Sequence, residues 1–369
     1  LDDIDPDSRA RILSVLPAVP EDLEEVLALN GVAGPSTCLY RSLERQPRGL
    51  NRTALIRQSV VACEAFVSLL NSWEAARIIN AMPGDGDFWF KALQYCGEGH
   101  LQAVLDEYLA VLTEWRGYDR MDDPTKALTR LVGDLQSVLT LRTSVYQVLR
   151  DGNERPERVS MRGRFAVRFG DSTSEDAQQQ RVESVSLAFN SPFWPFVLTS
   201  TSVGQEGLDF HLYCHSVSHW NLPGNPVDLE QREGRIHRYK GHAIRKNVAR
   251  SEGPPSGSAE PWAELFARAE DRVRGTALSD ITPYWVYLPE HLPEADRSRI
   301  ERHLPITPYS REASRIDSLL SSVAYYRLAF GQPRQEELVQ HVLTGIVDDD
   351  LREELSQVRV NLSPPGTDS

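Results

Sequence analysis

Residues 199–242 read TSTSVGQEGLDFHLYCHSVSHWNLPGNPVDLEQREGRIHRYKGH, and the pattern of these residues predicts the type of fold. A short apolar run at residues 196–198 leads into a turn rich in threonine, serine and glycine. A second apolar segment follows, and then a helix that Pro226 opens. Apolar runs separated by a polar turn and followed by a helix predict an α/β arrangement of strand, turn, strand, turn and helix.

The helix predicted after Pro226 carries the sharpest chemical pattern in the chain. Residues three and four apart lie above one another on a helix, so one face would present Gln231, Gly234, Arg235 and Arg238. Two guanidinium groups with no acid among these four residues suit an anion, and a polyphosphate is the natural candidate. The glycine would let the ligand approach closely. The alternative is an arginine-rich surface helix.

Two motifs in this order resemble those of a known family. The patterns T-x-x-x-x-x-G-L-D (from Thr201 to Asp209) and Q-x-x-G-R-x-x-R (from Gln231 to Arg238) resemble motifs V and VI of superfamily 2 helicases and translocases. The residues between them resemble the switch/sucrose-nonfermenting branch, especially bacterial translocases of the RNA-polymerase-recycling type, at Trp220, Asn225, Pro226 and Glu230. The resemblance implies a RecA-like lobe, a parallel sheet flanked by helices with ligand contacts at the carboxyl ends of the strands.

The resemblance also implies a role for each matching residue. Arg235 and Arg238 would reach across a cleft to the γ-phosphate of ATP and stabilise the charge of the transition state. Gln231 would lie in the same cleft and couple the nucleotide state to closure of the two lobes.

The remaining motif residues divide between nucleotide and nucleic acid. Gly207, Asp209 and Gly234 would lie at the nucleotide. Thr201 and Ser202 would bond to the nucleic-acid backbone, which requires no reading of sequence. Alternatively, these two hydroxyls only stabilise a turn.

Half of an ATPase site is missing from the sequence. A phosphate-binding loop needs G-x-x-x-x-G-K-S/T, and none of the lysines follows one: Lys91, Lys126, Lys240 and Lys246. There is no D-E-x-H or D-E-A-D box, and residues 348–350 (DDD) are typical of the acidic first turn of a helix. We therefore expect ATP and Mg²⁺ to be held by a first RecA-like lobe on a longer polypeptide. This chain alone is expected to be inactive.

The rest of the chain predicts helical regions around this lobe. Residues 1–150 are interpreted as a helical accessory region, with Asn51 capping a long helix through Met82. Further helices are predicted at 88–115, with an interruption at Gly97–Gly99, and at 124–150. A polar linker at 151–158 precedes the lobe at 159–250, which would begin with a strand at 164–170 and a helix at 174–190. A mainly helical extension is predicted at 262–360, with a short strand at 284–288, and a disordered tail at 361–369.

Composition narrows the class of protein. The chain has 369 residues and a net charge of −13, with 40% hydrophobic and 25% charged residues, as is usual for a soluble globular protein. No apolar run approaches the ~20 residues that span a bilayer, and we expect no membrane partner and a cytoplasmic location. Residues 231–250 hold seven Lys or Arg and one acid, so a basic strip lies on an acidic chain.

Three histidines could suggest a metal. On a strand, His211, His215 and His219 would share one face but spread over ~25 Å, too far to meet one ion. We expect no metal site there. The leading interpretation is thus the C-terminal motor lobe of a helicase or double-strand translocase, with DNA favoured over RNA and a defence or repair complex as a compatible setting. The alternative is a helicase-like module that binds nucleic acid or protein without turning over ATP.

Overall fold

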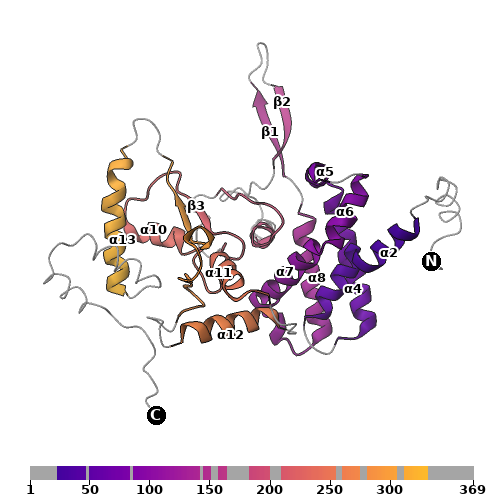
Figure 1. Ribbon diagram of the computed structural model, residues 1–369. Helices are drawn as coiled ribbons and strands as arrows, with labels where there is room; N and C mark the ends of the chain where they lie inside the picture. The colour runs from indigo at the N-terminus through magenta and orange to yellow at the C-terminus, as the bar shows by residue number, and fades with distance from the viewer. Residues whose placement is uncertain are drawn as a thin grey trace. The chain divides into compact units, whose positions relative to one another are not determined.

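The computed structural model describes residues 23–46, 50–83, 86–141, 144–150, 157–163, 183–199, 209–254, 260–274, 281–305 and 311–330. The chain divides into two compact units, Leu1–Thr140 and Leu141–Ser369, and Figure 1 labels their helices and strands. Among the predicted elements, the strand at 164–170, most of the helix at 174–190 and everything beyond residue 330 lie outside the described residues.

The described part of the first unit is helical, as the sequence predicts. Its elements are α2 (Leu23–Ala33), α3 (Pro35–Glu44), α4 (Arg52–Leu70), α5 (Trp73–Ala81), α6 (Phe88–Gly97), α7 (His100–Arg116), the 3₁₀ turn η1 (Tyr118–Arg120) and α8 (Pro124–Leu139). The interruption predicted between residues 97 and 99 separates α6 from α7, where Gly99 has a left-handed φ of 86°.

The helix predicted from Asn51 to Met82 is two helices. Its start is confirmed, because the Asn51 side chain accepts a hydrogen bond from the backbone N–H of Thr53 at 2.8 Å. The first of them, α4, ends at Leu70 with Asn71 as its C-cap, and Ser72 caps α5 by accepting from the N–H of Ala75 at 3.3 Å. The apolar period continues through this break, so the sequence pattern alone did not reveal it.

The bundle buries leucine and aromatic side chains from α3, α4, α7 and α8. Those with less than 2% exposure are Leu39, Leu43, Phe66, Leu105, Tyr108, Leu109, Leu112, Leu128, Leu131 and Leu135. Among the described residues, α4 is long and apolar enough to cross a membrane by length and composition alone, which we did not expect from the sequence. Core helices of soluble proteins meet the same criterion, and α4 packs against α3 and α8.

The helix predicted at 124–150 is wrong beyond Leu139. Residues 144–150 (SVYQVLR) form strand β1 (Ser144–Arg150), which pairs antiparallel with β2 (Glu157–Gly163) so that Val148 lies opposite Val159. The valines and tyrosine of this segment favour an extended backbone once a partner strand is present. Residues 157 and 158 belong to β2 and not to the predicted linker.

The second unit contains a small parallel sheet within a mostly helical surround. Its described elements after β2 are a helix at residues 183–189, β3 (Ser216–Ser218), α10 (Pro226–Glu233), α11 (His242–Glu252), α12 (Pro261–Val273), the 3₁₀ turns η3 (Glu294–Asp296) and η4 (Ala313–Arg315), β4 (Glu301–His303) and α13 (Ile316–Phe330). β3 and β4 are parallel, with Val217 opposite Arg302. The RecA-like sheet is therefore seen only in part.

Two strand predictions are wrong in this unit. Residues 196–198 and 284–288 have no strand pairing, and β3 is paired instead with β4, which the sequence did not suggest. Residues 196 and 197 are largely exposed, at 71% and 80%, so the apolar run that predicted a buried strand is a surface segment.

Helices of the C-terminal segment pack directly on helices of the motif region. α12 lies against α11 through a cluster that includes Ile244, Val248, Leu265, Phe266 and Tyr287. α13 lies beside α10 (Figure 1) through Leu222, Leu229, Leu319 and Val323. Burial of these side chains fixes the ends of α10 and α11, between which the candidate site lies.

Candidate functional site

The helix predicted to carry all four motif residues is shorter than expected. α10 begins as predicted, with Pro226 in its first turn and the Asn225 side chain accepting from the N–H of Asp228 at 2.8 Å. It ends at Glu233, however, with Gly234 as its C-cap. Gln231 is therefore an exposed helical residue, whereas Arg235 and Arg238 belong to the turn that follows.

The turn after α10 has its own hydrogen bonds. The N–H groups of Ile236 and His237 both bond to the carbonyl of Glu233 at 3.0 Å, and the N–H of Phe210 bonds to the carbonyl of Arg235 at 2.9 Å. A methyl group on Gly234 would lie 3.0 Å from the carbonyl oxygen of Glu230, so the close turn favours glycine here. A helical period thus persists in the sequence beyond the point where the backbone leaves the helix.

Asp209 and Arg238 meet in the structure. The Nε of Arg238 donates to Oδ1 of Asp209 at 3.0 Å, and the two side chains are 46% and 42% exposed. They are separated by 29 positions and come from the two different motifs. An exposed ion pair of this kind contributes little stability, about 0–1 kcal/mol. Arg238 can therefore exchange its carboxylate for an anionic ligand at small cost.

Arg235 is held differently from Arg238. Its side chain is half-buried and interacts with other groups of the chain. The two arginines consequently do not share a helix face, and the single anion-binding face predicted from their spacing is corrected to a turn in which each has its own surroundings.

The three histidines of the 211–219 segment lie in separate environments. His215 Nδ1 is 3.1 Å from Nδ1 of His242, whereas His219 Nε2 is 3.4 Å from a carboxylate oxygen of Glu233. His211 is 7% exposed, and its Nδ1 has no hydrogen-bond partner. Among the described residues, no three His, Cys, Asp or Glu side chains are grouped so that they could hold a metal ion.

His211 is kept neutral beside the ion pair. The pKa of His211 is lowered to about 4: burial is the main cause, the charge of Asp209 opposes it, and the positive charges of Arg245 and Arg238 act in the same direction as burial. The lobe therefore buries an uncharged imidazole next to its two motif residues at neutral pH.

The sequence analysis did not predict a buried ionic cluster that Glu233, at the end of α10, forms with Arg302 and His219. Glu233 is 3% exposed and accepts hydrogen bonds from Arg302 on β4, one of them from Nη2 at 2.7 Å. His219 lies on the other side of the same carboxylate. Arg302 is 69 positions away, so no local pattern pairs it with Glu233. The one local indication of this cluster was that Glu233 shares a face of α10 with the buried Leu229.

Buried donors on α11 fix the surrounding loops. Arg245, 3% exposed, donates to the carbonyls of Lys240 and Leu212. Asn247, 1% exposed, donates to the carbonyls of Tyr287 at 2.7 Å and Ser298 at 2.9 Å. Because irregular backbone carries unpaired carbonyls, these side chains take the place of a sheet partner.

Three predicted site residues cannot be placed. Thr201, Ser202 and Gly207 lie in the segment 200–208, outside the described residues. The structure thus brings together Asp209 and Arg238, locates Gln231, Gly234 and Arg235 nearby in the chain, and leaves the predicted backbone-binding hydroxyls as predictions.

Comparison with known families agrees with the motif assignment at the level of the domain. Residues 160–240 match the sequence model described as helicase conserved C-terminal domain. That range contains Asp209, Gln231 and both arginines. No characterised protein and no solved structure matches the chain. The match supports a helicase C-terminal lobe, with the general expectation of nucleic acid and a partner lobe, and leaves the particular translocase branch as a prediction.

Proposed function

We propose that the second unit is the C-terminal motor lobe of an ATP-dependent nucleic-acid helicase or double-strand translocase. The observation that carries the proposal is the Asp209–Arg238 contact, which joins two motif residues within a segment that matches the helicase C-terminal domain. An arginine held at a half-exposed position by a weak pair is oriented yet available.

The proposed roles follow from the side chains. Arg238 would leave Asp209 and bind the γ-phosphate, since guanidinium–phosphate hydrogen bonds are charge-assisted and frequently bidentate. Arg235 would add a second positive charge, and Gln231, exposed on α10, would sense closure of the lobes. Gly207, Asp209 and Gly234 would border the nucleotide, whereas Thr201 and Ser202 would contact the nucleic-acid backbone.

The complementary half of the site would come from a first RecA-like lobe on a longer polypeptide. That lobe would hold ATP and Mg²⁺, which supply the phosphoryl group and neutralise its charge. Double-stranded DNA as the track, a cytoplasmic location and recruitment to a defence or repair complex belong to the same proposal.

A second function deserves a test because the sequence has no phosphate-binding loop of its own. The lobe would then bind nucleic acid or a partner protein without ATP turnover. The two functions differ in what Arg238 does: the motor needs its charge for turnover, whereas a binding module needs it at most for affinity.

Arg238→Ala in the longer protein that includes the first lobe separates the two functions. We expect nucleic-acid-stimulated ATP hydrolysis to fall by about 10³-fold or more, the range known for arginine fingers, with nucleic-acid affinity nearly unchanged. Steady-state kinetics and a binding titration measure the two effects.

Arg274→Ala is the matched control for this experiment. Arg274 is also an exposed arginine paired with an aspartate, Asp271, at 2.7 Å, but it lies at the end of α12. It should change neither quantity. Unchanged turnover in Arg238→Ala would contradict the motor function, and a loss of affinity alone would favour the binding module.

A further inference from the structure

The arginine-bearing turn is held by the C-terminal segment that precedes β4. The N–H of Lys240 donates to the carbonyl of Tyr284 at 2.8 Å. Nε2 of His237 lies 3.0 Å from the carbonyl of Trp285. The turn that carries Arg235 and Arg238 is therefore bonded to Tyr284 and Trp285 of a distant segment, 48 positions away in the case of His237 and Trp285, and not only to α10 and α11.

Lys240 is also held by three aromatic rings. Its ammonium nitrogen is 4.9 Å from the ring centroid of Phe266, 5.2 Å from that of Tyr239 and 6.0 Å from that of Tyr284. Tyr284 is stacked between the other two rings, with centroid distances of 5.4 Å to Phe266 and 5.7 Å to Tyr239. Cation–π attraction is strongest where the cation has lost water, as in this half-buried position.

The backbone of Lys240 is in an unfavourable conformation for a lysine. Its φ is +48°, the left-handed region in which glycine is the residue of lowest cost. Among the described residues, Lys240 is the one residue other than glycine with a positive φ. Such strain persists only when surrounding contacts compensate for it, and the three rings supply those contacts.

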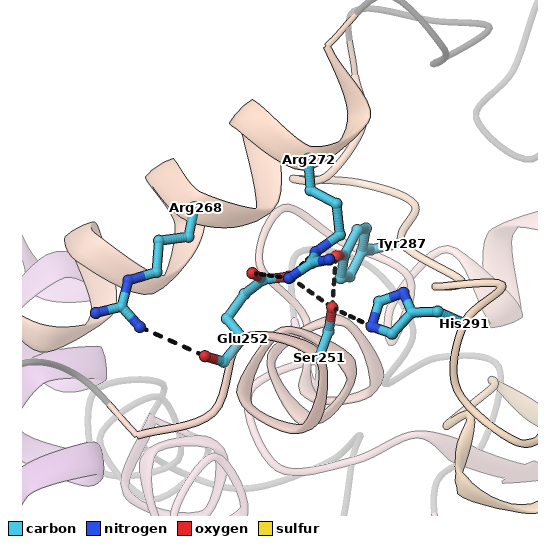
Figure 2. Close-up of polar contacts among 6 residues, drawn as sticks. All are labelled: Ser251, Glu252, Arg268, Arg272, Tyr287 and His291. Carbon is cyan, nitrogen blue, oxygen red and sulfur yellow. Dashed lines mark hydrogen bonds and ion pairs between the residues drawn. The ribbon is translucent and has the colours of Figure 1, made fainter.

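The supporting segment is itself fixed at its other end. Figure 2 shows Tyr287 and Ser251 meeting the carboxylate of Glu252, which also accepts two hydrogen bonds from Arg272 of α12 at 2.9 and 3.0 Å. The side chain of Asn247 donates a hydrogen bond to the carbonyl of Tyr287 at 2.7 Å. The segment therefore acts as a rigid support and not as a loose extension.

We propose that Lys240 and Tyr284 are positioning residues that hold Arg238 where it can bind the γ-phosphate. The segment that contains Tyr284 and Trp285 would then contribute to the function of Arg238. This inference rests on the proposed motor function. A ring cage around Lys240 sets the path of the backbone two residues after Arg238, and the Asp209 pair sets the direction of its side chain. Loss of the cage would leave Arg238 present but misplaced.

Limited proteolysis tests the support without any requirement for activity. Trypsin cleaves after arginine, and cleavage of a native protein reports local opening. Lys240→Met keeps the stem and removes the charge, so we expect cleavage after Arg238 to accelerate about tenfold, the size expected from a desolvated cation–π contact. Lys240→Arg should retain the wild-type rate, since a guanidinium also binds rings. Lys126→Met, at an exposed lysine of α8, is the control.

Hydrogen exchange of the wild-type chain provides a measurement that needs no variant. The Lys240 amide should exchange slowly because it is bonded to the carbonyl of Tyr284. Exchange at the rate of an unprotected amide would overturn the proposal, even if Lys240→Met failed to fold.

Turnover in the longer protein then connects the support to function. We expect Lys240→Met to lower kcat by about tenfold or more, with the KM for ATP and the nucleic-acid affinity unchanged, and Lys240→Arg to restore kcat. Wild-type proteolysis and kcat in Lys240→Met, beside a loss of turnover in Arg238→Ala, would overturn the support and leave the motor function standing. Retained turnover in Arg238→Ala would instead reject the motor function.

Discussion

The helical bundle of the first unit and the lobe of the second unit both bury apolar side chains, but among the described residues only the lobe also buries charged, imidazole and amide side chains. The bundle buries leucines and aromatic rings from regular helices, whose backbone hydrogen bonds are internal to each helix. The lobe buries His211 of a loop, Glu233 of α10, and Arg245 and Asn247 of α11. Arg245 and Asn247 donate to backbone carbonyls of irregular segments, and Glu233 accepts hydrogen bonds from the guanidinium of Arg302.

This difference explains why the candidate site lies in the second unit. Helices hold side chains at fixed periods, but a turn such as 234–241 can bring an arginine to an aspartate of another motif only if its irregular backbone is fixed. Buried polar groups fix it, and they do so with directional bonds. The bundle should accordingly tolerate substitutions that preserve shape, whereas the lobe should not.

The largest expected effect comes from breaking the Glu233 cluster. Glu233→Ala leaves Arg302 and His219 beside an empty, buried site, and we expect a loss of about 3–5 kcal/mol from the free energy of unfolding. Glu233→Gln keeps the shape but removes the charge that Arg302 needs, so it should still be clearly destabilising. Urea unfolding gives the free energies, and hydrogen exchange assigns the loss to the second unit.

Leu131 in the bundle provides the matched pair of substitutions. Leu131 is fully buried, and Leu131→Ala should cost about 2–5 kcal/mol in exchange-derived stability of the first unit. Leu131→Met preserves volume and should cost less than about 1.5 kcal/mol. If Glu233→Gln proved as mild as Leu131→Met, the contrast between a shape-dependent and a bond-dependent core would be wrong.

The next effect is a pH dependence confined to the lobe. Burial lowers the pKa of His242 to about 3, helped by Arg245, His215 and Lys246, and burial lowers the pKa of His211 to about 4. An unfolded histidine, with a pKa near 6.5, binds a proton first as pH falls, which favours the unfolded chain. The free energy of unfolding is therefore unaffected by these two histidines well above pH 6.5. It decreases as the pH falls below 6.5, by about 1 kcal/mol per histidine at pH 5.5.

Thermal melts between pH 7.5 and 5.5, with exchange resolved by unit, measure this dependence. His242→Gln should reduce the slope of stability with pH, because it removes an imidazole whose pKa is strongly lowered in the folded chain. His100, at the surface of the first unit, provides the comparison variant His100→Gln. An equal slope in both units would show that buried histidines are not its cause.

The same contrast explains what the sequence could predict. The starts of two helices were predicted correctly because local residues determine them. Asn51 caps α4, and Pro226 lies in the first turn of α10 after Asn225. Motif spacing singled out Asp209 and Arg238, because their types and order are local information, and the structure places these two side chains in contact; their functional roles stay predictions. A helix C-terminus at Glu233 was missed, since the residues beyond it keep a helical period.

Long-range partners account for the remaining differences. β1 needs β2, and β3 needs β4 more than 80 positions away, so neither pairing is visible in a window of sequence. The support of Lys240 by Phe266 and Tyr284 is equally non-local. A segment that the sequence predicted as a mainly helical extension thereby contacts the turn that carries the arginines.

The smallest expected effect is the loss of a helix N-cap, which should cost the same free energy in the lobe and in the bundle. Asn225 caps α10 in the lobe through the N–H of Asp228 at 2.8 Å, and Asp123 caps α8 in the bundle through the N–H groups of Thr125 and Lys126 at 2.9 and 3.1 Å. A helix N-terminus has the same unpaired donors wherever it lies, so Asn225→Ala and Asp123→Ala should each cost about 1 kcal/mol.

Urea unfolding of the two cap variants, with hydrogen exchange assigning each loss to its unit, decides what kind of difference separates the regions. Equal losses would mean that regular helix obeys the same energetics in both, and that the sensitivity of the lobe resides in its loops and their buried donors. A loss several times larger for Asn225→Ala would mean that the lobe is weakly stable as a whole. In that case, Glu233 and Lys240 variants would have to be interpreted as global destabilisation and not as the loss of a fixed turn.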